Sequence, residues 1–375
     1  MKKNFTLLFF AFVSLAFSQA GAPATPYYNG FNWTLTGMSL KNALTTKVIS
    51  THTNFLTYAE AENALRYTDL DPTDVTNTNL LLLYGFSNNI CTYVSETDFG
   101  TSADDNDHRR RNKNADSGDQ NCAWNREHTY ARALGTPNID TNEADADVHH
   151  VRASDVARNG MRDNDRFFDG SGNSFESGIL WYPGDEWKGD VARMMMYMYL
   201  RYGSQCLPTG VAQTGIATAA NDSNMVQLFL EWNAEDPVSV YEDRRNTYLG
   251  NTANTYGQGN RNPFIDNPYL ATVIWGGPVA ENRWPTVILS TEDFASIENA
   301  SIYPNPTINN EVYVSTATEL KSIVLYNING QIIQEIKNPS KVENDAYKVS
   351  NLPTGFYLML LATENASTTK KIIVN

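Results

Sequence analysis

A glutamate and a histidine stand side by side in the stretch WNREHTYAR, with one arginine before the pair and another after it. Glu127 offers the oxygen ligands that hard divalent cations prefer, and His128 can take a proton from water near neutral pH. An arginine can hold the non-bridging oxygens of a phosphate. These residue types suit metal-assisted hydrolysis of a phosphodiester, although a lone Glu-His pair is most often ordinary polar surface.

A second polar cluster follows in DADVHHVRASDVARNGMRDNDRFF, residues 145–168. The letters VHHVRA predict a strand, and Ser154-Asp155 predicts the cap of a helix that follows it. The residues expected near one face of that helix are Asn159, Arg162 and Arg166. The order strand, connection, strand, helix would bring His128 from the first arm and Asn159 from the last to one site.

Two pairs of neighbours constrain this site. Adjacent residues on a flat strand point to opposite faces, so Glu127 and His128 must lie at a strand end or a bend if both serve one site. His149 and His150 allow a catalytic zinc site as an alternative. We favour one of them as a structural hydrogen-bonding residue and the other as a buried supporting residue.

The surrounding segments read mainly as helices. Apolar spacing predicts helices at residues 39–52, 58–68 and 190–203, and two helices within 225–249 that are broken near Pro237. The methionines of MMMYM are expected in the core. TNLLLLYGF predicts a short buried strand. The polar stretch at residues 101–121 predicts a loop whose arginines form a solvated flap or, as the alternative, follow a phosphate backbone.

The sequence pattern changes around residues 290–300, from helical spacing to an alternation of apolar and polar residues. Short alternating segments follow, and Asn329-Gly330 between IVLYNI and QIIQEI predicts a hairpin. GFYLMLLATEN and TTKKIIVN predict two further strands. This is a separate all-β module of about 75 residues, and it contains no grouping of acid, base and nucleophile.

The net charge bears on the binding partner, and the N-terminal residues indicate the cellular compartment. The 375-residue chain has a net charge of −14, which argues against a nucleic-acid partner unless the site itself is locally basic. A basic start and the apolar run FTLLFFAFVSLAF predict a secretory signal peptide cleaved after Ser18 or Ala20, with an N-terminal anchor as the alternative. Export makes a disulfide feasible, and we favour Cys91 with Cys122 over pairs that use Cys206.

Several separated motifs resemble the bacterial endonuclease I family. They are WNREH, DVHHVRASDVARNGMRDNDRF, WKGDVARMMMYMYLRYG, DPVSVYEDRRN and GQGNRNPFIDNPYLATVIW, in the family's order, within residues 27–275. The resemblance implies an α+β fold, a mostly helical nuclease domain around a ββα-metal motif. It also implies a secreted or periplasmic nuclease that cuts DNA, and often RNA, with little sequence preference.

The resemblance assigns roles residue by residue. His128 would be the general base, and Glu127 and Asn159 the protein ligands of Mg²⁺, with Ca²⁺ or Mn²⁺ as alternatives. Arg132 is the first candidate for the arginine that steadies the phosphate. The substrate-binding candidates are Arg152, as second choice for that role, and Arg162. Where the family commonly has prolines after these motifs, the chain has Ala131 and Ala153, which affects the expected loop shape.

The C-terminal module resembles the type A sorting domain of the type IX secretion system. The similar stretches are YPNP, LYNINGQ, LPTGFYLMLL and the basic KKIIVN ending. The resemblance implies a Gram-negative host, passage across the outer membrane by that machinery, and removal of the module. The alternative is a carbohydrate-binding or surface-binding β-sandwich.

The sequence thus predicts a signal peptide at 1–18, a nuclease domain at 21–290, a linker at 291–300 and a sorting β-sandwich at 301–375. The expected protein is a secreted, Mg²⁺-dependent, non-specific endonuclease, monomeric and without a membrane span. DNA is its expected substrate, and the sequence leaves open whether RNA is a substrate as well. The alternative is a catalytically silent nucleic-acid-binding or surface-binding protein on the same scaffold.

Overall fold

The computed structural model of the chain describes residues 21–88, 107–116, 123–140, 143–287, 300–342, 345–363 and 367–375. The chain divides into two units, Met1–Arg283 and Trp284–Asn375. The predicted leader, all of the predicted linker except Ala300, and both Cys91 and Cys122 lie outside the described residues. Cys206 is buried as a free thiol. No helix in the described part of the chain is long and apolar enough to cross a bilayer.

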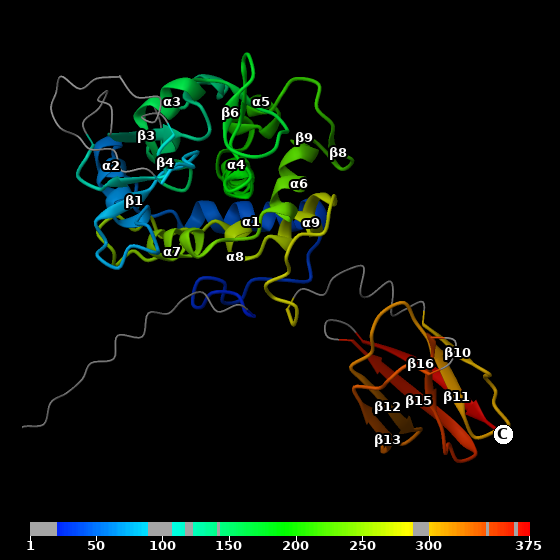
Figure 1. The fold of residues 1–375 in the computed structure, drawn as a ribbon. Coiled ribbons are helices and arrows are strands. Elements are labelled where there is room, and N and C mark those ends of the chain that lie inside the picture. Colours follow the sequence, from blue (N-terminus) through cyan, green and yellow to red (C-terminus); the bar gives the residue numbers. More distant parts are fainter. Residues whose placement is uncertain are drawn as a thin grey trace, which may run out of the picture. The chain divides into compact units, whose positions relative to one another are not determined.

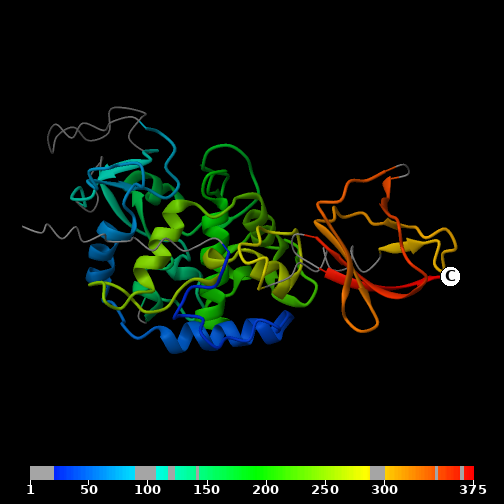
Figure 2. The ribbon, with the colours of Figure 1, turned by 90° about the horizontal axis from the view of Figure 1, so that it is seen from below.

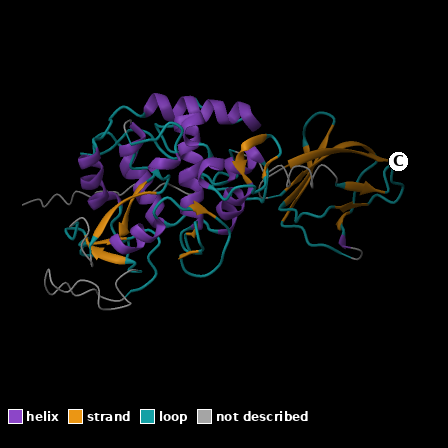
Figure 3. Ribbon diagram, turned by 90° about the horizontal axis from the view of Figure 1, so that it is seen from above, coloured by secondary structure: helices purple, strands orange, loops and turns teal. Residues whose placement is uncertain are grey.

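Helices form the body of the first unit (Figures 1 and 3). The predicted helices at 39–52, 58–68 and 190–203 are confirmed within two residues, and the break near Pro237 separates α6 from α7. The helices are α1 (Gly37–Thr51), α2 (Tyr58–Thr68), α3 (Val156–Arg162), α4 (Lys188–Tyr202), α5 (Pro208–Val211), α6 (Gln227–Glu235), α7 (Val240–Leu249), α8 (Pro263–Asp266) and α9 (Tyr269–Trp275), with 3₁₀ turns η1 (Arg132–Leu134), η2 (Glu143–Ala146) and η3 (Gly203–Cys206).

Short sheets lie at the edges of this helical body. Two-stranded antiparallel sheets pair β1 (Asn79–Leu81) with β2 (Arg110–Asn112), β3 (Trp124–His128) with β4 (Val151–Asp155), and β8 (Thr218–Ala219) with β9 (Asp222–Val226). A three-stranded sheet has the order β5 (Arg166–Phe167), β7 (Leu180–Tyr182), β6 (Phe175–Glu176).

Helix α4 is the centre of the first unit, and α1, α6 and α8 pack against it. Figure 2 shows α1 along one edge of the helical body. Every residue from Gly189 to Leu200 is buried, and the four methionines of α4 are at most 2% exposed. The prediction that these methionines belong to the core is therefore confirmed. Unbranched, polarisable side chains of this kind fill irregular gaps between helices.

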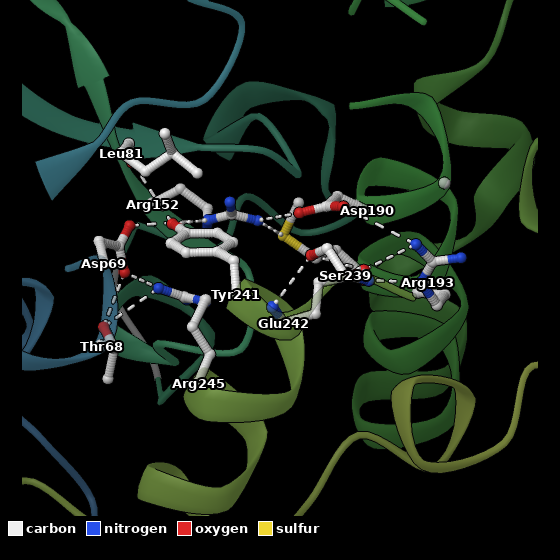
Figure 4. A network of polar contacts seen from close by, with 12 residues as sticks. Thr68, Asp69, Leu81, Arg152, Asp190, Arg193, Ser239, Tyr241, Glu242 and Arg245 are labelled. Atoms are coloured by element: carbon white, nitrogen blue, oxygen red, sulfur yellow. Dashed lines mark hydrogen bonds and ion pairs between the residues drawn. The ribbon is translucent and has the colours of Figure 1, made fainter. Parts of the chain in front are cut away.

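A buried network of charges fastens β4 to the helices (Figure 4). Arg152 of β4 lies 3.2 Å from Asp190 of α4 and 3.6 Å from Asp69, which caps α2. Asp69 also pairs with Arg245 of α7 and accepts a hydrogen bond from the backbone N–H of Ala153 at 2.8 Å. An unpaired charge in the interior is strongly destabilising. Arg152 must therefore stay beside Asp69 and Asp190, and this holds the β3–β4 pair in place on the helical core.

In the described part of the second unit, the regular secondary structure is almost entirely β-strand (Figure 3). One sheet has the order β10 (Ser301–Tyr303), β11 (Val312–Ser315), β14 (Tyr347–Val349), and the other β13 (Ile332–Lys337), β12 (Ser322–Asn327), β15 (Gly355–Ala362), β16 (Ser367–Val374). Side chains from both sheets share one core, which includes Val314 and Met359. The predicted hairpin at Asn329-Gly330 and the two last strands are confirmed.

The prediction of an unbroken loop at residues 101–121 is wrong for its described part. Residues 110–112 form β2, which pairs with β1. Two of the three arginines there are not solvated as predicted: Arg111 is 5% exposed and bonds Asp155, while Arg109 pairs with Glu186. Arg110 is exposed and pairs with Asp71. Contacts with distant segments, and not the local polar composition, therefore decide the structure of this stretch.

Candidate active site

The antiparallel pair β3–β4 and helix α3 frame the candidate site (Figure 1). In the pairing register His128 lies opposite Val151. Because β4 runs directly into α3, the Asp155 side chain can cap the helix, and it accepts from the backbone N–H groups of Ala157 and Arg158 at 3.0 and 3.2 Å. The predicted cap and helix are therefore confirmed. β3, β4 and α3 therefore meet at one corner of the first unit.

A cavity of about 380 Å³ opens at this corner. Glu127 and His128 are the last two residues of β3, and both line the cavity. The predicted placement of the pair at a strand end is confirmed, and it resolves the conflict with strand alternation. The lining residues are Asn125, Arg126, Glu127, His128, Ala131, Arg132, Val156, Asn159, Gly160, Arg162, Asp163 and Asn164.

The side chain of Glu127 is buried, with 3% of the residue exposed. Its Oε1 accepts a hydrogen bond from the Tyr84 hydroxyl at 2.9 Å and lies 3.5 Å from Nε of Arg162. Among the described residues, these contacts engage only Oε1 of the carboxylate. Oε2 is therefore available as a ligand for a hard cation.

The ring of His128 is held through one nitrogen. Its Nε2 lies 2.9 Å from the backbone carbonyl oxygen of Asp145 and 3.1 Å from Oδ1 of the same residue. Both partners are acceptors, so Nε2 of the neutral ring carries the hydrogen and Nδ1 keeps its lone pair. Burial would raise the pKa of Asp145, but hydrogen bonds from His128 and Arg132 outweigh it and lower that pKa. An ionised carboxylate therefore backs the imidazole.

Asn159 reaches the same cavity from α3. Its Nδ2 donates to Oδ1 of Asn125 at 2.8 Å and to the carbonyl oxygen of Arg126 at 3.2 Å. These two acceptors fix which end of the amide faces β3, and within the described chain no hydrogen bond engages its Oδ1. A carboxylate oxygen and an amide oxygen on the wall of one cavity fit Mg²⁺, which keeps several waters and takes few protein ligands.

The three arginines singled out from the sequence occupy different places. Arg132 lines the cavity and is the most exposed of them, at 36% of its side chain, with Nε bound to Asp145. Arg162 lines it too but is 1% exposed, and it donates to the carbonyl oxygens of His128 and Thr129 at 3.3 and 2.9 Å. Arg152 does not line the cavity, because its guanidinium belongs to the buried network. Arg152 is therefore not placed to bind a substrate in this cavity.

The predicted face of α3 is correct for two residues of three. Asn159 and Arg162 both lie on the helix and line the cavity. Arg166 lies beyond the helix in β5, and its guanidinium donates to Thr214 at 2.8 Å. The helix ends at Arg162 because Asp163 follows with a positive φ of 43°, which reverses the chain.

Tyr58, the first residue of α2, also belongs to the site, although nothing in the local sequence predicts this. The guanidinium carbons of Arg126 and Arg132 lie 3.5 and 4.4 Å from the centre of its ring, and the His128 ring stacks on it at 5.7 Å. Such cation–π contacts hold long arginine side chains in place. Tyr84 and Asp145 were also missed, and only their contacts in space identify them.

His149 and His150 are both buried and bound to the backbone. Nε2 of His149 lies 3.1 Å from the carbonyl oxygen of Asn260, and Nε2 of His150 lies 2.7 Å from that of Ala144. Nδ1 of His150 accepts from the backbone N–H of Tyr130 at 3.4 Å. Within the described ranges, no group of three or more His, Cys, Asp or Glu residues is placed to hold a metal ion.

His150 is expected to make the fold sensitive to acid. Burial, and then the neighbouring His128, lower the pKa of His150 from 6.5 to about 4. The folded chain therefore binds fewer protons than the unfolded chain between these values, so stability is full above pH 6.5 and falls as the pH drops toward 4. We expect His150 to contribute a loss of about 1.4 kcal/mol per pH unit in this window.

Denaturant unfolding of the wild type and of His150→Asn at several pH values in this window tests the expectation. The variant should be less stable at neutral pH but should lose less stability on acidification. Parallel pH dependence in the two proteins would show that His150 is not the group that titrates.

Two family models match separate regions of the chain. Residues 36–269 match the family model described as Endonuclease I, and residues 301–375 match that of a Secretion system C-terminal sorting domain. The Extracellular ribonuclease of Bacillus subtilis (strain 168) is 37% identical over 271 residues, which cover 68% of this chain and 82% of that protein. The Extracellular ribonuclease of Bacillus amyloliquefaciens is 38% identical over 251 residues, 64% of this chain and 74% of that protein.

A solved structure also shows a weak likeness. A chain of the complex of Porphyromonas gingivalis RgpB pro- and mature domains aligns with 56% of this chain and 53% of its own length, at 10% identity and a TM-score of 0.17. This chain thus spans about half the length of that one, and a TM-score at this level carries no argument about fold or function.

Proposed function

Because the chain belongs to the endonuclease I family, we propose that the cavity at the end of β3 hydrolyses internal phosphodiester bonds of nucleic acids with the help of a divalent cation. The chain ends in a secretion-system sorting domain, and the protein is secreted. Two Bacillus relatives are named extracellular ribonucleases, which favours RNA as a substrate. We propose that DNA is cut as well, since neither Glu127 nor His128 needs to read a base or a 2′-hydroxyl.

The meeting of three groups in one cavity carries this proposal. Glu127 keeps one carboxylate oxygen available, Asn159 keeps its amide oxygen available, and His128 keeps the lone pair of Nδ1. These groups come from β3 and α3, and all of them line the same cavity. An oxygen donor pair beside a fixed base is what metal-assisted hydrolysis of a phosphodiester requires.

Glu127 and Asn159 are the residues that would hold the cation. We propose Mg²⁺, with Mn²⁺ or Ca²⁺ as alternatives, because both ligands are hard oxygens. When bound, the cation supplies positive charge against the charge that develops on the phosphate and the leaving oxygen. Tyr84 and Arg162 hold the opposite oxygen of Glu127, so the ligand is oriented before the cation arrives.

His128 serves as the general base. Nδ1 takes a proton from the attacking water, and the ring becomes an imidazolium whose Nε2–H stays bonded to Asp145. The ionised carboxylate of Asp145 stabilises that positive charge and keeps the ring in the required tautomer. The histidine therefore needs no rearrangement during proton transfer.

Arg132 is our proposed contact for the non-bridging phosphate oxygens. It is partly exposed on the cavity wall, and Tyr58 and Asp145 hold it from the protein side. Arg126 and Arg162 add positive charge to the same wall. These three lining arginines outnumber the two lining carboxylates, Glu127 and Asp163, although the whole chain carries a net charge of −14. Local charge, rather than net charge, governs binding of a phosphate backbone.

A cleavage assay with plasmid DNA and with structured RNA, each with Mg²⁺ or with EDTA, tests the proposal. We expect nicking and then fragmentation of the plasmid, and fragmentation of the RNA, with Mg²⁺ only. Undiminished cleavage in EDTA would remove the cation from the reaction, and absence of cleavage of both substrates would remove the nuclease activity. Cleavage of one substrate alone would fix the preference.

The sorting unit is expected to be dispensable for cleavage and required for export. The candidate active-site residues all lie in the first unit. A chain that ends at Thr291 should cut nucleic acid within about threefold of the full-length rate, since separate domains fold on their own. In the native host we expect the same chain to remain in the periplasm, because its proposed route across the outer membrane depends on the sorting machinery.

Zymography of the culture medium and of the periplasm, with purified protein as reference, measures both effects. A soluble but inactive truncated chain would mean that the second unit helps to build the site. Normal appearance of the truncated enzyme in the medium would favour a binding role for that unit. We propose that the protein acts as a monomer, which sedimentation of the purified chain will check.

A further inference from the structure

We propose that Tyr84 is a positioning residue for Glu127: its hydroxyl holds Oε1 so that Oε2 is presented to the cation. This inference rests on the proposed function, because it concerns how the chain prepares that metal ligand. The hydroxyl donates to Oε1 at 2.9 Å, and both side chains are buried. Tyr84 is not among the lining residues of the cavity, so it acts through Glu127 and not on the substrate.

The backbone of Tyr84 adopts a conformation that its side chain disfavours. Its φ is +69°, in the left-handed region where a bulky residue is a steric outlier. Every other described non-glycine residue with a positive φ is Asn or Asp, the types that tolerate this region. An outlier of this kind persists only where its surroundings hold it, and such outliers gather at functional sites.

The surroundings of Tyr84 hold it from several sides. Ser174 donates from its hydroxyl to the carbonyl oxygen of Tyr84 at 2.6 Å. The preceding Leu83 donates its N–H to the carbonyl oxygen of Ala153 in β4 at 2.8 Å. The following Gly85 passes so close to the segment before β2 that a Cβ there would lie 2.1 Å from a backbone carbonyl oxygen. The fold therefore fixes the hydroxyl against the end of β3.

The hydrogen bond decides which way the carboxylate of Glu127 faces. Without the hydroxyl, the only other described partner of Oε1 is Nε of Arg162 at 3.5 Å. The carboxylate could then rotate into a closer ion pair with this arginine and withdraw the oxygen that faces the cation.

Calorimetric titration of the full-length chain with Mn²⁺ tests this inference directly. We expect Tyr84→Phe to raise the Kd for Mn²⁺ about tenfold, the scale typical of a lost contact to a metal ligand. Ser174→Ala should shift it in the same direction by a smaller factor. The matched control is Tyr28→Phe, whose buried hydroxyl donates to the arginine-paired carboxylate of Asp266 at 2.8 Å, away from the cavity lining. Its Kd should equal that of the wild type.

Cleavage at saturating Mn²⁺ gives a second readout. Because Tyr84 only orients the ligand, Tyr84→Phe should recover to within about threefold of the wild-type rate once the site is filled. An unchanged Kd in Tyr84→Phe, with a raised Kd in Glu127→Gln, would overturn this inference and leave the proposed metal site standing. An unchanged Kd in Glu127→Gln would overturn the metal site itself, and this inference with it.

Discussion

Replacing His128 with alanine is expected to lower the single-turnover rate of nucleic acid cleavage by about 10²–10⁴-fold, the usual cost of a lost general base. The ring is fixed by Asp145 through Nε2 and stacks on Tyr58. Among the described residues that line the cavity there is no other histidine. His150, the neighbouring ring, is buried and bound to the backbone of Ala144. It cannot substitute for the missing base.

Three measurements separate loss of the base from loss of the fold. The thermal unfolding curve and the affinity for a phosphorothioate oligonucleotide should stay close to those of the wild type. Added imidazole should restore part of the rate in His128→Ala, because the substitution leaves space in a solvent-accessible cavity. A rate within about tenfold of the wild type would refute the assignment of His128.

Replacing Glu127 with glutamine is expected to raise the Mg²⁺ concentration for half-maximal cleavage by roughly 10–100-fold or more. The substitution keeps the shape of the side chain but removes the negative charge that a hard cation requires. Asn159→Ala should shift the same curve in the same direction. Its effect should be smaller, because an amide oxygen carries no full charge.

Glu176→Gln is the matched control for Glu127→Gln. Glu176 is an exposed carboxylate in β6 that does not line the cavity, so its loss should leave the Mg²⁺ dependence unchanged. If the Glu127→Gln curve superimposed on that of the control, Glu127 would be excluded as a ligand, and a catalytic role for the cation elsewhere would have to be sought.

Local pattern in the sequence is enough to predict the frame of the site. The cap at Asp155 and helix α3 follow from a capping residue before an amphipathic turn. The position of Glu127 and His128 at a strand end follows from strand alternation once both are assigned to one site. The methionine-rich α4 follows from its apolar spacing. In each case neighbours within a few residues decide the outcome.

Contacts between distant segments could not be predicted in this way. Tyr84 lies 43 residues from Glu127 in the chain, yet it holds the carboxylate. Arg152 looks like a phosphate contact in the sequence, but Asp69 and Asp190 bury it in an ion network. Residue type states what a side chain can do, whereas partners from other elements decide what it does.

The most direct test of the central claim is the position of a bound cation relative to an uncleaved substrate. Crystals of His128→Ala with Mn²⁺ and a short oligonucleotide would locate the ion by its anomalous scattering. We predict a peak in the cavity at about 2–2.5 Å from a carboxylate oxygen of Glu127 and from Oδ1 of Asn159, with a phosphate oxygen as a further ligand. An ion bound away from these two residues, or a substrate phosphate outside the cavity, would contradict the account.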